Sequence, residues 1–586
     1  MKKNIFLIDT IAVVCFNLAV VYGQTAQTLR SEEQAAEARQ ILQQYEMARR
    51  GELEQPIKCG FTAMALLQAD PALAAQFPAL AKAKLQRPTL PFFYTTPSGR
   101  FKFHYTLTGA DAVNPTSTIS PPVPDYVYEA GLAAERAYHL LIDSLGFAPH
   151  ASDNGNDGPE LDFYFQNDQS YGATFPEFSG GQTRGPAYIT VENDFNGFYT
   201  TGVHALRVTV AHEYFHAVQL NIRNINGDSF FFEISSTWFE DVAYDYVNDY
   251  IAYLLNRRSQ PFGLFQTLGL PLNTANRWHE YGACIWLHYL VKKLGPGRFR
   301  FRNNVVYDFW QRSTVEPALA GMKTVLESSG YSLPFSEALR EFGEWCFFTG
   351  ARADTVRYFE EAKTYPQIDF GTQADGRPKS FRVNQDTVIT VSLPSMAIHV
   401  YRAARLGQDV RFFLQPSVPG SEAALWKITT ISGDRTQGYS KQSGAGFASL
   451  EVQAPAGEDT VVFMVVHANP SSAAQTSNYR LEVSLLGQQQ LVNALEKPYP
   501  NPYRYKDAEL LVVPFRIREG AKVEAVLLRE DGYMVWKMNL GTLPAGRHRV
   551  VWDGLNQSGD RVASGVYFFR LLVEGFQATT KFVVIN

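Results

Sequence analysis

The segment that most constrains this 586-residue chain reads VTVAHEYFHAVQLNI and spans residues 208–222. Its apolar residues recur at steps of three and four: Val208, Ala211, Phe215, Val218 and Ile222. This spacing predicts an α-helix about four turns long with one buried face. His212 and His216 lie one turn apart on a neighbouring face, so both imidazoles can reach a single divalent ion, and Glu213 can contact a water bound to it. The alternative is a helix whose histidines only cap it or pair with acids.

A catalytic zinc site needs a third protein ligand and one open position. The segment FFFEISSTWFEDVAYDY, residues 230–246, predicts a second helix whose buried stripe repeats every four residues: Ile234, Trp238 and Val242. Glu233 stands near its start, far enough after His216 to allow a connecting loop, and we predict it as the third ligand. Three further polar residues lie one or two turns on, where they can orient the ligand histidines: Thr237, Glu240 and Asp241. Two alternatives remain: Glu240 as the ligand, or all of these acids as a solvated face.

The strings AHEYFHAVQ and EISSTWFED resemble the paired AHEFFHxxQ and EGTAxWxED motifs of a family of secreted bacterial zinc metallopeptidases. The order, HExxH and then a glutamate on the following helix, is similar to that of the gluzincin clan. The resemblance covers about residues 95–365 and departs at Ile234 and Ser235, where the family usually has Gly and Thr. It implies a zincin-like fold, a Zn²⁺ cofactor, and hydrolysis of protein or peptide substrates by a zinc-activated water with Glu213 as general base.

A donor for the oxyanion is the remaining requirement of such a mechanism. The segment HEYGACIWLHYLVKKLG, residues 279–295, resembles the aminopeptidase helix that begins with an oxyanion-stabilising tyrosine, and this nominates Tyr281. The spacing differs from that pattern by about one residue. His279 and His288 are the alternative donors, each with an ordinary packing role as the competing explanation.

Charge and targeting signals exclude some functions and compartments. With 53 basic and 58 acidic residues the chain has a formal charge of −5, which gives no basic footprint for nucleic acid. Residues 1–23 read as a cleaved export signal, with Met1-Lys2-Lys3 as its basic start. No later segment is apolar over the roughly 20 residues that a membrane span requires. We therefore expect a secreted or cell-surface protein with no integral span in its mature form.

Export would leave three cysteines, Cys59, Cys284 and Cys346, an odd number that prevents complete pairing. The segment PIKCG, residues 56–60, resembles the cysteine-switch segment of matrixin propeptides, where a thiolate occupies the open zinc position. Cys59 would then keep the enzyme latent until residues 24 to about 90 are removed. The alternatives are a disulfide from Cys59 to one of the other two cysteines and an inert buried thiol.

A second metal is suggested by DNGNDGPELD, residues 153–162, which spaces three acids around glycines: Asp153, Asp157 and Asp162. A hard cation such as Ca²⁺ accepts this oxygen set. A polar turn with side-chain-to-backbone hydrogen bonds explains it equally well.

The expected fold class is a multidomain α+β protein with four regions after the signal. Residues 24–90 are a helical N-terminal extension or propeptide, and residues 91–365 a zincin-like metallopeptidase domain. Residues 366–487 and 488–586 alternate apolar and polar positions in short runs, which predicts two all-β sandwich domains.

The last of these regions, from PYPNPY to TTKFVVIN, resembles the FlgD-type immunoglobulin-like modules that commonly end proteins exported by the type IX secretion system. We expect Trp552 and Tyr567 in its core, and secretion machinery as a partner. The function that competes with a peptidase is a non-catalytic adhesin or binding protein that retains a peptidase-like domain.

Overall fold

The computed structural model describes residues 35–585. The exceptions within this range are residues 37, 54–55, 85, 121, 154, 179–181, 183, 226, 256–262, 296–303, 369–378, 383–385, 405–408, 417–422, 430–435, 440–451, 455–459, 469–475, 487–492 and 506–509. The predicted export signal, residues 1–23, lies outside the described residues. The chain divides into two compact units, one formed by Met1–Leu264 with Asn273–Tyr331 and the other by Phe265–Leu272 with Ser332–Asn586.

The first unit is built on a six-stranded sheet with strand order β1-β5-β6-β4-β3-β2. Its strands are β1 (Ile57–Cys59), β2 (Phe92–Thr95), β3 (Phe101–Tyr105), β4 (Leu161–Gln166), β5 (Ser170–Pro176) and β6 (Ala187–Glu192). Strands β3, β4 and β6 run parallel to one another, whereas β2 runs antiparallel to β3 and β5 antiparallel to β6. Strand β1 pairs parallel with β5 at the edge. All strands of this sheet except β2 are almost wholly buried, which fits a sheet covered on both faces.

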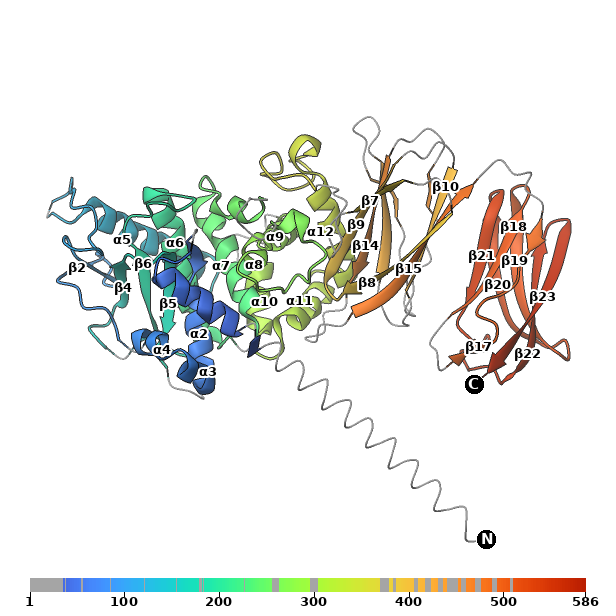
Figure 1. Ribbon diagram of the computed structural model, residues 1–586, viewed down its shortest axis with the longest axis horizontal. Coiled ribbons are helices and arrows are strands. Elements are labelled where there is room, and N and C mark those ends of the chain that lie inside the picture. Colours follow the sequence, from blue (N-terminus) through green and yellow to red (C-terminus); the bar gives the residue numbers. More distant parts are fainter. Residues whose placement is uncertain are drawn as a thin grey trace, which may run out of the picture. The chain divides into compact units, whose positions relative to one another are not determined.

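Helix α6 (Gly202–Ile222) lies at the centre of this unit. It packs against β5 and β6, and also against α5 (Asp125–Tyr138) and α7 (Ser229–Tyr244), as can be followed in Figure 1. The sequence predicted one buried face, yet every residue from Val208 to Leu220 is buried. The one-faced expectation is wrong because polar residues of this helix face other buried polar groups, which a hydrophobic period cannot show.

The first unit contains further helices besides α5, α6 and α7. They are η1 (His139–Ser144), η2 (Asp249–Tyr253), α8 (His279–Gly282), α9 (Ile285–Leu294), α10 (Val305–Arg312) and α11 (Ala318–Glu327). Among the helices that the structure describes, none combines the length and apolar character needed to cross a membrane.

The N-terminal extension is part of the first unit. Residues 38–49 are helical, and α2 (Phe61–Ala69), α3 (Pro71–Gln76) and α4 (Pro78–Lys84) follow β1, in keeping with the helical pattern of this region. One apolar core joins the extension to the sheet and contains, among others, Leu42, Tyr45, Met64, Leu67, Tyr164, Ala173 and Phe175. The extension therefore contributes both an edge strand and a covering layer to the unit that carries the HExxH helix.

The second unit contains α12 (Phe335–Phe347), η3 (Leu264–Gln266) at its boundary, η5 (Gly350–Arg352) and two sheets before residue 487. One sheet has the order β13-β10-β15-β8: β8 (Thr387–Pro394), β10 (Asp409–Pro416), β13 (Val452–Ala454) and β15 (Thr476–Leu486). The other has the order β12-β11-β14-β9-β7: β7 (Lys379–Arg382), β9 (Ala397–Ala404), β11 (Ala423–Thr429), β12 (Thr436–Tyr439) and β14 (Thr460–His467). Helix α12 packs on β14, although the sequence placed it with the preceding domain. The two differ because an apolar helix face does not specify which element it will cover.

The C-terminal region has a three-stranded sheet, β16-β18-β21, and a five-stranded sheet, β17-β23-β22-β19-β20. Its strands are β16 (Ala494–Leu495), β17 (Tyr503–Arg504), β18 (Leu511–Ile517), β19 (Ala521–Arg529), β20 (Met534–Leu543), β21 (Gly546–Trp552), β22 (Gly565–Val573) and β23 (Phe576–Ile585). Trp552 and Tyr567 are both buried in its apolar core, as predicted from the sequence. The expected mixed α/β architecture with a β-rich C-terminal region is confirmed.

A buried carboxylate in the first unit gives a pH-dependent prediction. Glu192 ends β6 and accepts a hydrogen bond from the Asp168 backbone N–H at 3.0 Å. Burial, together with the charges of Asp194 and Asp168, raises the pKa of Glu192 to about 7. The folded state therefore holds this proton more tightly than the unfolded chain does, and the stability this provides is lost as pH rises through 7.

We expect Glu192→Gln to reduce the loss of stability between pH 5 and pH 7.5 by roughly 1–3 kcal/mol, measured by urea unfolding at both pH values. Glu135→Gln, a change at an ion pair with Arg100 on the surface, is the control and should leave the wild-type pH dependence unchanged. Identical pH dependence in Glu192→Gln and wild type would contradict the prediction.

Candidate metal centre

Helix α6 brings two imidazoles together. His212 and His216 are both buried, and their Nε2 atoms lie 3.0 Å apart. Residues four apart lie on the same side of an α-helix, one turn above the other. The local fold predicted from the sequence is therefore sufficient to place this pair.

Helix α7 adds the carboxylate of Glu233. Its Oε2 atom lies 3.3 Å from Nε2 of His212 and 3.5 Å from Nε2 of His216. The other oxygen, Oε1, accepts a hydrogen bond from the hydroxyl of Thr62 at 2.8 Å. Oε2 is buried and makes no hydrogen bond to any residue that the structure describes. Of the acids on α7, Glu233 is the one in the described residues whose carboxylate lies close to both Nε2 atoms.

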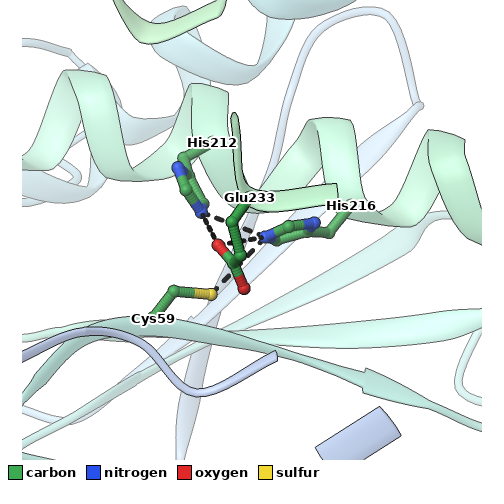
Figure 2. Close-up of side chains that lie close together, drawn as sticks. All are labelled: Cys59, His212, His216 and Glu233. Carbon is green, nitrogen blue, oxygen red and sulfur yellow. Dashed lines mark hydrogen bonds and ion pairs between the residues drawn. The ribbon is translucent and has the colours of Figure 1, made fainter. Parts of the chain in front are cut away.

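Strand β1 contributes the fourth member, Cys59, whose Sγ lies 3.5 Å from Nε2 of His216. One donor atom from each of Cys59, His212, His216 and Glu233 lies within 4.8 Å of the other three. Figure 2 shows the four side chains pointing toward one another. Cys59, Cys284 and Cys346 are all free and buried, so the disulfide considered for Cys59 does not form in this structure.

The ring nitrogens that face away from this group have their own partners. Nδ1 of His212 lies 2.6 Å from Oε1 of Glu240, and Nδ1 of His216 lies 2.7 Å from Oε1 of Gln219. Such contacts fix which nitrogen carries the proton and leave Nε2 as a metal donor. Glu240 therefore supports His212, and the alternative in which Glu240 is itself the ligand does not fit this geometry.

Sequence reasoning missed Gln219. Its amide nitrogen donates to the hydroxyls of Ser235 and Ser236 at 3.2 and 3.0 Å, which orients its oxygen toward His216. Gln219 stands three residues after His216, where a helical side chain can reach back to the ring, and this spacing was the available signal. The contact with Ser235 links α6 to α7 through polar groups.

Lys58 was also missed, although it precedes Cys59 directly. Its buried ammonium lies 2.8 Å from Glu240 and 2.5 Å from Asp249. Tyr171 donates a hydrogen bond to the same Asp249 at 3.2 Å. A lone basic residue in a loop-like segment gives no signal of a buried ion pair, because its partners are about 180 and 190 residues away in sequence.

Glu213 lies beside the group. Its Oε2 accepts a hydrogen bond from the hydroxyl of Thr174 at 2.7 Å, while Oε1 is buried and has no hydrogen bond among the described residues. Cys59 lies opposite Gly172 in the sheet, and Gly172 packs against Glu213, so this carboxylate lies close to the Cys59 residue. Burial and the charge of Glu213 raise the pKa of the Cys59 thiol. Glycine at position 172 allows the Glu213 side chain to pack closely against strand β5, because a Cβ there would lie only 2.8 Å from Cγ of Glu213.

Tyr281 lies on α8 and is buried. Burial, followed by the charges of Glu233 and Cys59, raises the pKa of Tyr281 well above its usual value. The phenol therefore remains protonated at neutral pH, and the part of the chain that the structure describes shows no hydrogen bond from it to the four-residue group.

The other predicted supporting residues take different positions. Asp241 lies 3.7 Å from Nδ1 of His288, and burial lowers the pKa of His288 to about 3. Asp241 thus contacts a histidine of α9 that is not among the ligand candidates, and its support of a ligand histidine stays a prediction. Thr237 and His279 are both buried.

Charge in the group favours a bound cation. Burial opposes a charge on His212, yet Glu233 and Glu240 outweigh it and raise the pKa of His212 to about 9. Burial likewise opposes ionisation of Glu233, but the two imidazoles hold the pKa of Glu233 well below its usual range. The carboxylates thus attract positive charge to this place, and two nitrogens, one oxygen and one sulfur form a donor set suited to Zn²⁺.

The acids considered for calcium are paired with basic side chains. Arg87 lies 2.6 Å from Asp153 and 2.5 Å from Asp162, and Lys102 lies 3.1 Å from Asp157. The Asp153 carboxylate also accepts the backbone N–H of Gly155 at 3.0 Å. The Asp153 contact is that of the polar-turn alternative, and Arg87 supplies positive charge to Asp153 and Asp162. Asp157 and Asp162 also lie with His104 in a group of possible metal donors, so a calcium site stays a prediction.

Comparison with known proteins identifies the C-terminal region. Residues 513–574 match the model of the FlgD Ig-like domain. No curated protein matches the sequence at a significant level. The match gives the family of this region and does not extend to the first unit.

Solved structures give weak likenesses. PorZ, a surface component of the type IX secretion system of Porphyromonas gingivalis, is 22% identical over 18% of this chain and 14% of PorZ, with a TM-score of 0.14. Latent PorU from the same organism is 15% identical over 37% of this chain and 19% of PorU, with a TM-score of 0.14. The pre-peptidase C-terminal domain of a Bacillus anthracis collagenase is 13% identical over 19% of this chain and 100% of that domain, with a TM-score of 0.16. At these scores the likenesses support no conclusion about function.

The role of Gln219 can be tested by metal affinity. We expect Gln219→Leu to weaken zinc binding by about 10- to 100-fold, because His216 loses the acceptor that fixes its ring. Competition with a chromophoric chelator measures this affinity. Gln76→Leu, on the surface of α3, is the matched control. Equal affinity in Gln219→Leu and wild type would show that Gln219 does not support a metal ligand.

Proposed function

We propose that this protein is a zinc-dependent peptidase that hydrolyses protein or peptide bonds, with a zincin-like catalytic domain in the first unit. The observation that carries the proposal is the convergence of His212, His216 and Glu233, with Glu213 beside them. The two histidines and Glu213 come from α6 and Glu233 from α7, so two packed helices supply the whole set. The order of these residues is similar to that of gluzincins.

The donor set fits a zinc ion. Zinc takes imidazole nitrogen, carboxylate oxygen and thiolate sulfur, and catalytic sites commonly use three protein ligands. A buried carboxylate oxygen without a hydrogen bond, as in Glu233, calls for a cation or another partner. His212, His216 and Glu233 would hold the ion, which supplies Lewis acidity toward a carbonyl oxygen and lowers the pKa of water.

Glu213 is the proposed general base. Thr174 holds its Oε2, which leaves Oε1 as the atom that accepts a proton from water and passes it to the leaving amine. The Tyr281 phenol keeps its proton at neutral pH and is the proposed donor to the developing oxyanion. Glu240 and Gln219 act through the histidines as positioning residues.

A second candidate is a non-catalytic surface protein, such as an adhesin, in which the metal serves structure alone. The observation that favours it is the presence of four donors, because structural zinc sites use four protein ligands and keep no open position. Glu213 favours the peptidase, since a purely structural site has no use for a buried carboxylate oxygen without a hydrogen bond.

The proposed location is extracellular, either secreted or on the cell surface. The FlgD Ig-like match at residues 513–574 supports this, because such modules commonly end exported proteins. We propose the C-terminal region as the part that engages the secretion machinery, with protein or peptide substrates as the other partners.

Glu213→Gln tests the mechanism. We expect the variant to retain one zinc per chain and to lose casein hydrolysis by roughly 10²- to 10⁴-fold, because the amide cannot accept the proton. Metal analysis and hydrolysis of a labelled casein measure the two effects, using protein in which hydrolysis by the wild type is detectable and abolished by a chelator.

Glu177→Gln is the control, since that carboxylate pairs with Arg87 away from the four-residue group. It should keep both zinc and activity. Full hydrolysis by a zinc-loaded Glu213→Gln protein would refute the peptidase mechanism, and a metal-loaded wild type without hydrolysis under any condition would favour the non-catalytic alternative.

A further inference from the structure

Strand β1, which carries Cys59, contacts the candidate site at the metal position, along the sheet edge and through an ion pair. We propose that β1, with Lys58 and Cys59, is a built-in inhibitor of the zinc site: its thiolate takes the metal position that hydrolysis needs open, and its backbone takes the sheet edge available to an extended substrate. This inference rests on the proposed function and concerns the regulation of that same site.

The first contact is with the metal position. Sγ of Cys59 lies 3.5 Å from Nε2 of His216, and it belongs to a group whose four donor atoms lie within 4.8 Å of one another. Donors bound to one tetrahedral zinc at about 2.0–2.3 Å are separated by roughly 3–4 Å. Cys59 is thus placed to be a fourth ligand, and its thiol would release a proton to solvent as the metal binds. Four protein ligands leave no position for water.

A second feature of the same group also points to an ion. The Oε2 atom of Glu233 is buried, faces both imidazoles and makes no hydrogen bond among the residues that the structure describes. A cation held between the thiol, the imidazoles and this oxygen would satisfy it.

The second contact is along the sheet. Strand β1 is the edge strand and pairs parallel with β5, with Ile57 opposite Ser170 and Cys59 opposite Gly172. Two backbone hydrogen bonds support the pairing, from Ile57 N–H to Gln169 O at 3.1 Å and from Gly60 N–H to Gly172 O at 2.9 Å. Extended peptides commonly bind proteins by adding a strand to a free sheet edge. The edge of β5 beside Glu213 is already covered by the chain's own segment.

The third contact is an ionic anchor. The ammonium of Lys58 is buried between Glu240 and Asp249, at 2.8 and 2.5 Å. Glu240 uses its other oxygen to contact Nδ1 of His212 at 2.6 Å. The inhibitor strand is therefore joined to a metal ligand both through the metal position and through this carboxylate.

The turn after Cys59 fits closely as well. A Cβ at Gly60 would lie 2.6 Å from the Tyr45 ring and 2.7 Å from Cβ of Ala173, so the segment can occupy this place only with glycine. Charge, backbone pairing and close packing all hold the strand in place. We infer that the closed form is the resting state and that activity requires withdrawal or cleavage of this segment.

The experiment uses the purified chain loaded with Co²⁺ as a spectroscopic substitute for zinc. Wild type should bind one Co²⁺ per chain and show thiolate-to-cobalt charge-transfer absorption in the near ultraviolet. Cys59→Ala should bind the same amount of Co²⁺ and lose that absorption. Cys346→Ala makes the same chemical change at another buried cysteine, in the second unit, and should keep the absorption.

Hydrolysis of casein by the zinc-loaded proteins tests inhibition. The double variant Lys58→Met/Cys59→Ala removes both the thiolate and the ionic anchor, and its rate should exceed that of wild type by about tenfold or more if the closed form holds at least nine-tenths of the molecules. Cys346→Ala should match wild type. Limited proteolysis of the Co²⁺-loaded wild type should remove the thiolate absorption in step with a rise in hydrolysis.

The outcomes separate the inference from the function on which it rests. Bound Co²⁺ without thiolate absorption in wild type would overturn Cys59 as a ligand while leaving the peptidase proposal intact. Thiolate absorption with equal hydrolysis by wild type and the double variant would overturn the inhibitory role. Thiolate absorption without hydrolysis in any form would refute the peptidase itself. The wild-type spectrum needs no substitution, so the test holds even if a variant does not fold.

Discussion

The first unit depends on the packing of α6 between the sheet and α7. This helix is buried from Val208 to Leu220, although it carries two histidines and a glutamate. Polar groups of this kind are costly in a protein interior unless each has a partner. The partners come from α7, β5 and β1, so each of these elements helps to satisfy the buried polar groups in the closed form.

Ion pairs between buried side chains connect the candidate metal ligands to other parts of the first unit. One carboxylate oxygen of Glu240 pairs with the Lys58 ammonium and the other contacts the His212 ring. Asp249 forms the second ion pair of Lys58. Removing one member of such a network leaves another charge buried without compensation. The N-terminal segment is thereby tied to the histidines by electrostatics as well as by its place in the sheet, which gives a physical basis for control of the site by that segment.

Local sequence patterns predicted part of this structure. The four-residue spacing of His212 and His216 places both rings on one side of a helix, and the position of Glu233 near the start of the next helix brought it within reach. The short alternating runs of the last 220 or so residues predicted strands, and Trp552 and Tyr567 lie in the C-terminal core. Patterns were weaker for polar partners, and none indicated that Asp241 would lie beside His288.

By itself the sequence determined the helical register of the HExxH segment, the candidate residues for the centre, and the β-rich character of the region after residue 365. These depend on neighbours three or four residues away or on alternation. Only the tertiary structure decided that Cys59 joins the group, that Lys58 lies between Glu240 and Asp249, and that the N-terminal extension supplies the edge strand of the sheet. It also decided that Arg87 lies among the acids considered for calcium. These contacts join residues separated by tens to almost two hundred positions, and no local period records which distant charge a buried side chain will meet.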